Sequence, residues 1–264
     1  MHRLLRIALL LAALLLASLV PASAAPRSSR TVQNLRWHIQ FTGTLRVPRD
    51  AHYVFLDLFD TEPAVVSRLT RQGKRVICYL NAGAWEEWRP DAAAYPEEIL
   101  GHPYEGWPGE RWVDIRRLDL LAPILQARLD LCRAKGFFGV DPDNLNGFLN
   151  DTGFPLTAAD QLRFNRWLAA EAHARGLAIG LKNDAEQASE LVASFDWILV
   201  ESCVAEGWCA LTAPFRQAGK PVFALEYVER GVTKAQMCQA ARRYGLSAQL
   251  KRRELDAWSQ PCWR

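Results

Sequence analysis

Short apolar runs alternate with segments of helical spacing along nearly the whole chain, and this alternation limits the fold more than any other feature. It is typical of a parallel sheet, because parallel strands need a crossover, usually a helix, between them. About eight such units fit in the chain, which suits a (β/α)8 barrel better than an open doubly wound sheet. We therefore predict one α/β domain, a TIM-type barrel, over residues 37–264.

The predicted strands are buried runs of mostly apolar residues. They are Tyr53–Phe59, Arg75–Leu80, Trp112–Ile115, the run that ends at Asp141, Ala178–Leu181, Trp197–Val200, Val222–Leu225 and Ser247–Leu250. Helical spacing predicts helices over Glu62–Gln72, Leu118–Ala134, Thr157–Arg175, Glu186–Ala193, Leu211–Gln217 and Thr233–Tyr244. Trp37–Gly43 is interpreted as an entry segment rather than a full strand, and Ala84–Glu110 as a long Trp/Pro-rich loop after the second strand.

Polar side chains stand where these strands end. The positions are Asp57, Asn81, Asp114, Asp143, Asp184, Glu201 and Glu226. An open sheet would gather its polar ends near one switch point, whereas a barrel collects catalytic residues around the whole carboxyl end. A ring of carboxylates at the mouth of a barrel therefore favours acid/base or covalent chemistry on a neutral substrate.

Two of these carboxylates form the predicted catalytic pair, Asp143 and Glu201. Glycoside hydrolysis needs one carboxylic acid and one ionised carboxylate, with their pKa values set apart by the surroundings. Glu201 follows an apolar strand, where a carboxylate is costly unless it is used or paired. The alternatives are that Asp143 only caps a loop and that Glu201 only pairs with Lys182. The stereochemical outcome stays open.

The aromatic content also fits a sugar site. Of ten tryptophans, Trp85, Trp88, Trp107 and Trp112 cluster around the long second loop. The indole offers a broad apolar face and one donor, which suits stacking on a pyranose ring. The alternative is that each of these rings packs the rim or the core.

The first residues have the pattern of a processing signal. Arg3 and Arg6 precede the apolar run Ile7–Val20, and Ala22-Ser23-Ala24 fits a cleavage site. We predict a signal peptide over residues 1–24, a flexible new N-terminus over 25–36, and a secreted or periplasmic protein with no stable membrane span after cleavage. Without the two signal arginines, 30 basic residues face 29 acidic ones. This balance argues against a nucleic-acid partner, which would need a basic face.

Six cysteines follow the signal, and an even number in an oxidising compartment suggests disulfides. Cys203–Cys209 is the best candidate pair, because a short loop joins the two residues. Cys238–Cys262 would then hold the C-terminal tail, and Cys78–Cys132 would tie a strand to a neighbouring helix. No Cys-x-x-Cys or paired His motif indicates a metal, and no Gly-rich phosphate-binding motif is present. We expect no metal and no organic cofactor.

Seven segments occur in an order that is known from one family. They are Asp57–Thr61, Val76–Tyr79 with Ala82-Gly83 and Trp85-Glu86, Trp88–Asp91, Gly139–Asn144, Gly153–Thr157, Gly180–Asp184 and Glu201–Cys203. With them the chain resembles glycoside hydrolase family 114, the endo-α-1,4-polygalactosaminidases, from about Trp37 to Tyr227. The resemblance implies a secreted (β/α)8 barrel that cleaves α-1,4-linked galactosamine or N-acetylgalactosamine polymers.

The resemblance also implies roles for single residues. Asp143 corresponds to the Asp of the Pro-Asp-Asn motif and is expected to be the nucleophile; Glu201 corresponds to the Glu after strand six and is expected to be the acid/base. It supports the Cys203–Cys209 pair as well. We expect a monomer whose substrate contacts come from Asp57, Asp60, Asn81, Trp85, Asp141, Asn144, Lys182, Asp184, Glu226 and Tyr227.

Five positions depart from the family pattern. One is His38, which falls in a segment where the family often has further Gln or Trp. Asp141 stands where Glu is usual, Asn81 replaces Ser, and Asn146 and Phe148 stand where Asp and Tyr are common. Two rival functions therefore stay open: a barrel glycosidase for another glycan, and a secreted carbohydrate-binding protein that has lost turnover.

Overall fold

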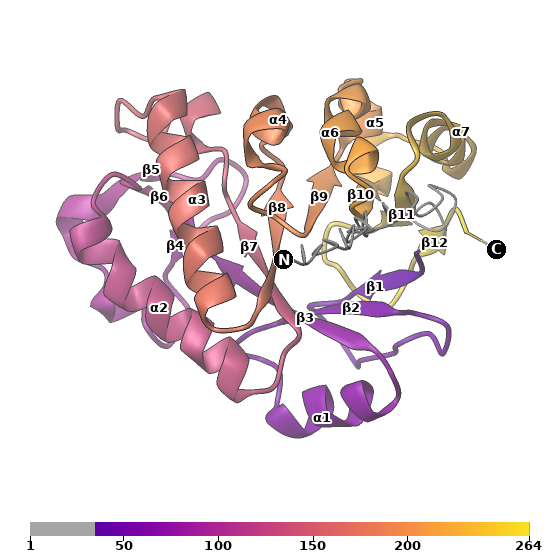
Figure 1. The fold of residues 1–264 in the computed structure, drawn as a ribbon, viewed down its shortest axis with the longest axis horizontal. Helices are drawn as coiled ribbons and strands as arrows, with labels where there is room; N and C mark the ends of the chain where they lie inside the picture. The colour runs from indigo at the N-terminus through magenta and orange to yellow at the C-terminus, as the bar shows by residue number, and fades with distance from the viewer. Residues whose placement is uncertain (1–34, 264) are drawn as a thin grey trace, which may run out of the picture.

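The fold is a curled, mostly parallel sheet with helices on its outer side (Figure 1). The computed structural model describes residues 35–263, so the predicted signal peptide and most of the predicted flexible N-terminus lie outside the described residues. Eight strands run parallel in the order β1, β2, β3, β7, β8, β9, β10, β11, and β12 joins β11 antiparallel. Their bounds are Trp37–Ile39, Tyr53–Asp57, Arg75–Asn81, Gly139–Asp143, Ala178–Lys182, Trp197–Glu201, Val222–Tyr227, Ser247–Lys251 and Gln260–Pro261.

Helices fill most of the crossovers between these strands. They are α1 (Pro63–Arg71), α2 (Leu118–Ala134), α3 (Ala158–Ala174), α4 (Ala188–Leu191), α5 (Cys203–Glu206), α6 (Ala213–Gln217) and α7 (Lys234–Tyr244). Thr157 and Thr233 each form a capping box at the start of α3 and α7, respectively. No helix within residues 35–263 is long and apolar enough to cross a membrane.

Side chains along each strand point alternately to the inside and the outside of the curled sheet, and this divides the core into two layers. Residues such as Phe55, Trp197 and Phe223 point to the inside of the curled sheet and form one apolar cluster. Their neighbours, such as Val54 and Ala224, point outward and pack under the helices in a second, larger cluster. Gly180 makes room for the inner layer, because a Cβ there would lie 2.0 Å from Nε1 of Trp197.

Two of the predicted strand assignments are wrong. Trp37–Ile39, interpreted as an entry segment, is the first parallel strand, β1; it is only three residues long and contains the polar His38, so it gives little strand signal. The segment at Trp112 lies instead in β6 (Glu110–Val113), which pairs antiparallel with β4 (Ala84–Glu86) and β5 (Leu100–Pro103). These three strands, here called the loop sheet, occupy much of the segment that was predicted to be a Trp/Pro-rich loop. Asp114 follows β6 and binds Arg116 at 2.7 Å.

The two edges of the curled sheet approach each other. The indole Nε1 of Trp37 in β1 donates to the carbonyl oxygen of Ser247 in β11 at 2.8 Å, and the Phe41 N–H donates to the carbonyl of Leu255 at 2.9 Å. Within residues 35–263, however, the ladder runs from β1 to β12 without a β-bridge from β11 back to β1.

All three predicted disulfide pairs are present: Cys78–Cys132, Cys203–Cys209 and Cys238–Cys262, with Cα–Cα distances of 6.0, 4.8 and 5.2 Å. They tie β3 to α2, the start of α5 to the turn that follows it, and α7 to the C-terminal tail.

Cys78–Cys132 closes the longest of the three loops, 54 residues, so its removal should cost the most stability. We expect a Cys78→Ala/Cys132→Ala variant to lose about 2–4 kcal/mol of unfolding free energy in guanidinium melts. The matched control is Cys203→Ala/Cys209→Ala, which opens a loop with a separation of only 6 residues. A larger loss from the control pair would contradict the chain-entropy argument.

Candidate active site

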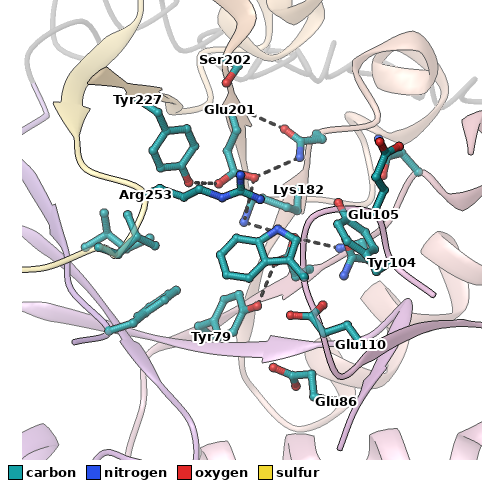
Figure 2. Close-up of a pocket in the computed structure, with 18 of the residues that line it drawn as sticks. Tyr79, Glu86, Tyr104, Glu105, Glu110, Lys182, Glu201, Ser202, Tyr227 and Arg253 are labelled. Carbon is teal, nitrogen blue, oxygen red and sulfur yellow. Dashed lines mark hydrogen bonds and ion pairs between the residues drawn. The ribbon is translucent and has the colours of Figure 1, made fainter. Parts of the chain in front are cut away.

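A cavity of about 750 Å³ opens at the carboxyl ends of the parallel strands. Six parallel strands each place one polar side chain on its wall: Asp57 from β2, Tyr79 from β3, Asp143 from β7, Lys182 from β8, Glu201 from β9 and Tyr227 from β10. Figure 2 shows Lys182, Tyr79, Glu201 and Tyr227 converging on one space. The predicted gathering of strand ends is therefore observed.

The ammonium of Lys182 lies among three carboxylates, and these four residues are here called the lysine cluster. Its Nζ is 3.3 Å from Oδ1 of Asp143, 3.6 Å from Oε2 of Glu201 and 3.8 Å from Oδ2 of Asp141. Burial alone would lower the pKa of Lys182, but the three carboxylates raise it well above its ordinary value. Lys182 is thus a fixed positive charge at the base of the cavity.

Asp143 is held by donors on more than one side. The Tyr79 hydroxyl donates to its Oδ2 at 2.9 Å, and the Asn144 N–H donates to its Oδ1 at 2.9 Å. With Lys182 beside Oδ1, these contacts fix the direction in which the carboxylate points.

Glu201 is held in a comparable way from the neighbouring strands. The Tyr227 hydroxyl donates to its Oε1 at 2.5 Å, and Nδ2 of Asn183 donates to its Oε2 at 3.3 Å. The side chain keeps 24% of its surface exposed, and it lines the cavity. Asp143 and Glu201 therefore present fixed carboxylates to one space from two different strands.

Backbone strain is concentrated at the same strand ends. Asn144, Asn183, Asp184 and Ser202 all have positive φ, between 40° and 61°. They directly follow β7, β8 and β9, and such conformations are costly for residues other than glycine. Gly83 completes this region, because a Cβ there would lie 1.8 Å from the carbonyl oxygen of Asn144. The strand ends are thus packed tightly enough to hold the cavity side chains in place.

A second charged group, here called the arginine cluster, lies beside the loop sheet. Arg89 donates to both carboxylate oxygens of Glu86 at 2.7 Å and pairs with Asp57 at 2.8 Å. Burial raises the pKa of Glu86 despite this partner. Glu110 lies opposite Glu86 in the β4–β6 ladder, and burial together with the charges of Glu86 and Asp143 raises the pKa of Glu110 to about 8.

Eight of the twelve predicted site residues line the cavity: Asp57, Asp60, Asp143, Asn144, Lys182, Asp184, Glu201 and Tyr227. Burial, the largest cause, raises the pKa of Asp184 to about 8, and its Oδ2 accepts from Nδ2 of Asn165 at 2.8 Å.

The other four predicted contacts lie away from the cavity wall. Glu226 points outward by strand alternation, and its carboxylate accepts from the backbone N–H groups of Val204 and Ala205 in α5. Asn81 is fully buried and hydrogen-bonds the Ala84 N–H. Trp85 donates its Nε1 to the carbonyl of Ala92. Asp141 is fully buried one layer below Asp143, and burial raises its pKa to about 7.

Several cavity residues were missed by sequence reasoning. Tyr79 sits within an apolar strand, so only its place two residues before the strand end could have marked it. Glu110 was expected at the end of a loop. An acidic residue is common in a loop, so its presence there does not indicate a role in a site. Arg253, from the segment after β11, lies 4.7 Å from the Trp107 ring and donates to the carbonyl of Gly106 at 3.2 Å, so the C-terminal segment forms part of the wall.

Acidic clusters of this kind also occur at metal sites. Within residues 35–263, no group of three or more His, Cys, Asp or Glu side chains is arranged to hold a metal ion.

Known proteins of one family match this chain. The sequence model of glycoside-hydrolase family GH114 covers residues 18–264. The crystal structure of Aspergillus fumigatus Ega3 in complex with galactosamine is similar, with a TM-score of 0.82 and 35% identity, over 91% of this chain and 100% of that one. The glycoside hydrolase domain of PelA from Pseudomonas aeruginosa shares the fold, with a TM-score of 0.65 and 18% identity over 85% and 97% of the two chains. An uncharacterized protein of Deinococcus radiodurans is 28% identical over 83% of this chain and 81% of its own length. Since the family model spans nearly the whole sequence, the chain belongs to glycoside-hydrolase family GH114.

Proposed function

We propose that this protein is a secreted, endo-acting glycoside hydrolase that cleaves α-1,4-linked galactosamine polymers, whether free or partly N-acetylated. The observation that carries the proposal is the pair Asp143 and Glu201, whose carboxylates both lie within 3.6 Å of the Nζ of one lysine in an acidic cavity. Membership of GH114 and the likeness to a structure that holds galactosamine support it. The predicted signal peptide and three disulfides support secretion.

The charge of the cavity favours a cationic sugar. The lysine and arginine clusters together hold five carboxylates around two cations, and Glu110 adds a sixth. A polymer of free galactosamine carries ammonium groups, which would lower the mutual repulsion of these carboxylates. Exposed aromatic side chains on the rim, Trp88 and Trp107, provide faces on which neighbouring sugar rings can stack.

We infer a route through a covalent intermediate. An oxygen of Asp143 attacks the anomeric carbon while the Glu201 carboxylic acid gives its proton to the leaving glycosidic oxygen. Glu201 then takes a proton from water, whose oxygen displaces Asp143 and releases the second product. No metal or organic cofactor takes part in either step.

The geometry of the pair favours net retention at the anomeric carbon. Both carboxylates lie within ion-pair distance of one Lys182 Nζ, so their nearest oxygens are no farther apart than the sum of the two distances. That limit includes the roughly 5–5.5 Å of retaining enzymes and reaches only the lower end of the roughly 6.5–9.5 Å of inverting ones.

We also infer that the eight parallel strands form a closed (β/α)8 barrel. The Trp37–Ser247 hydrogen bond between β1 and β11 supports this, because it joins the two edge strands that a barrel would pair.

The test is mass spectrometry of products after the mature protein, residues 25–264, is incubated with partly deacetylated α-1,4-galactosamine oligomers. We expect short oligomers from the unmutated protein and none from Glu201→Gln. Binding without products from the unmutated protein would sink the hydrolase assignment and favour the carbohydrate-binding alternative.

A further inference from the structure

Glu110 is a cavity carboxylate that the two-carboxylate route does not use. It lies in β6, only 8% exposed, and it lines the cavity. Figure 2 shows its carboxylate near Tyr79 and above Glu86. Its one side-chain contact is a long hydrogen bond, 3.4 Å, from Nδ2 of Asn81 to its Oε2. A buried carboxylate with so weak a partner costs free energy unless it binds something else.

Four other cavity carboxylates already have a cationic partner. Arg89 binds Asp57 and Glu86, and Lys182 lies beside Asp143 and Glu201. Among residues 35–263, only Glu110 and Asp184 are buried cavity carboxylates with no cation within 4.0 Å.

Asp184 is not equivalent to Glu110. Its Oδ2 accepts from Asn165, and its Oδ1 is enclosed by protein, without contact with the open cavity. A ligand in the cavity would therefore reach Glu110 but not the unpaired oxygen of Asp184. This leaves Glu110 as the buried carboxyl group with no cation beside it that a ligand in the cavity can reach.

Glu110 also lies close to the catalytic pair. The Asn81 side chain donates to Glu110 and accepts at Oδ1 from Nδ2 of Asn144, at 3.1 Å. Asn144 directly follows Asp143, and its backbone N–H holds the Asp143 carboxylate. One amide thus connects Glu110 to the residue that follows Asp143. Both carboxyl groups line the same cavity, and the charge of Asp143 is one of the causes that raise the pKa of Glu110.

We propose that Glu110 is a specificity-determining residue that binds the free ammonium group of a galactosamine unit beside the catalytic pair. The inference rests on the proposed function and deepens it, since it assigns the choice between free and acetylated sugar to one side chain. An ammonium supplies the cation that Glu110 lacks, whereas an N-acetyl group is neutral and bulkier.

The protonation of Glu110 is consistent with this role. Because its pKa is near 8 in the empty cavity, much of the carboxyl is protonated at neutral pH. An ammonium beside it favours the ionised form and so lowers that pKa. A neutral N-acetyl group has no such effect, so the two sugars differ in charge stabilisation as well as in size.

The experiment compares unmutated protein, Glu110→Gln and Glu110→Asp on free and on N-acetylated α-1,4-galactosamine oligomers. The control is Glu97→Gln, because Glu97 is an exposed acid that pairs with Arg111 of the same loop sheet and does not line the cavity. We expect Glu110→Gln to lower the ratio of kcat/KM for free over acetylated oligomers by about ten- to a hundredfold. Glu110→Asp keeps the charge and should retain part of the preference, while Glu97→Gln retains all of it.

A second readout, NMR titration with the monosaccharides galactosamine and galactose, separates this inference from the proposed function. If the unmutated protein cleaves neither polymer yet prefers galactosamine in a Glu110-dependent way, the proposed function fails and the inference stands. An unchanged ratio in Glu110→Gln, even with both rates lowered, overturns the inference, as does equal binding of the two monosaccharides to the unmutated protein. If Glu110→Gln does not fold, full preference in a folded Glu110→Asp supports a charge-based role, and loss of all preference there contradicts it.

Discussion

Asp143→Asn should lower kcat on α-1,4-galactosamine oligomers by at least about 10³-fold, because the covalent route loses its nucleophile. The amide keeps the size of the side chain and can still accept from Tyr79, which donates to Asp143 at 2.9 Å. The fold and oligomer binding should therefore persist. Single-turnover assays measure the loss, and circular dichroism and NMR titration check the fold and the binding.

Glu201→Gln provides the contrast that separates the two roles. With an aryl galactosaminide whose leaving group departs without protonation, Glu201→Gln should still show a burst of aryl product, while Asp143→Asn should show none. A burst from Asp143→Asn and none from Glu201→Gln would reverse the two assignments. If both variants cleaved the polymer as fast as the unmutated protein, neither carboxylate would take part in the chemical step.

Lys182→Met should be nearly as damaging, although Lys182 need not touch the reacting atoms. The substitution keeps a side chain of similar length but leaves Asp141, Asp143 and Glu201 together with no cation within the lysine cluster. Loss of the fixed geometry should lower kcat/KM by about 10²-fold or more at neutral pH. Because mutual repulsion now favours protonation, the acid limb of the pH–rate profile should move to higher pH.

The same variant should change how stability depends on pH. Carboxyl groups that repel one another in the folded state bind protons more tightly there than in the unfolded chain, so folding stability should fall as pH rises. Thermal melts from pH 5 to 8 would show the trend. Lys220→Met is the control. Lys220 donates hydrogen bonds to the carbonyls of Val192 and Phe195, and it does not line the cavity. Unchanged pH–rate profiles in Lys182→Met would contradict a role for this charge in catalysis.

The sequence predicts the strands that carry the proposed catalytic pair because their signals are local. An apolar run that stops at a carboxylate marks a strand end, and this rule placed Asp143 and Glu201 at the ends of β7 and β9. Lys182, expected among the substrate contacts, lines the cavity, and its ammonium lies 3.6 Å from Glu201, as the alternative for Glu201 required. The three disulfides were found because each pair joins elements that the predicted order makes neighbours.

The errors arose where the deciding contact is distant in sequence. Glu226 ends a strand like the others, but its side chain points outward, and only the position of α5 shows where it binds. The surroundings of Glu110 are set by Asn81 at the end of β3 and by Glu86, which lies opposite it in the loop sheet. The ring of Trp112 packs against that of Tyr104, with 4.7 Å between the ring centroids. The strand-like run at Trp112, which was assigned to the barrel, therefore belongs to the loop sheet.

The proposed catalytic carboxylates stand on β7 and β9, whereas Glu86 and Glu110 stand on the loop sheet, an excursion of the chain between β3 and α2. If Glu110 selects the amino sugar as proposed, a substitution within that excursion should change which sugar is accepted without altering the strands that carry Asp143 and Glu201. Substrate specificity could then change through the loop sheet alone, while the residues proposed for the chemical step stay the same.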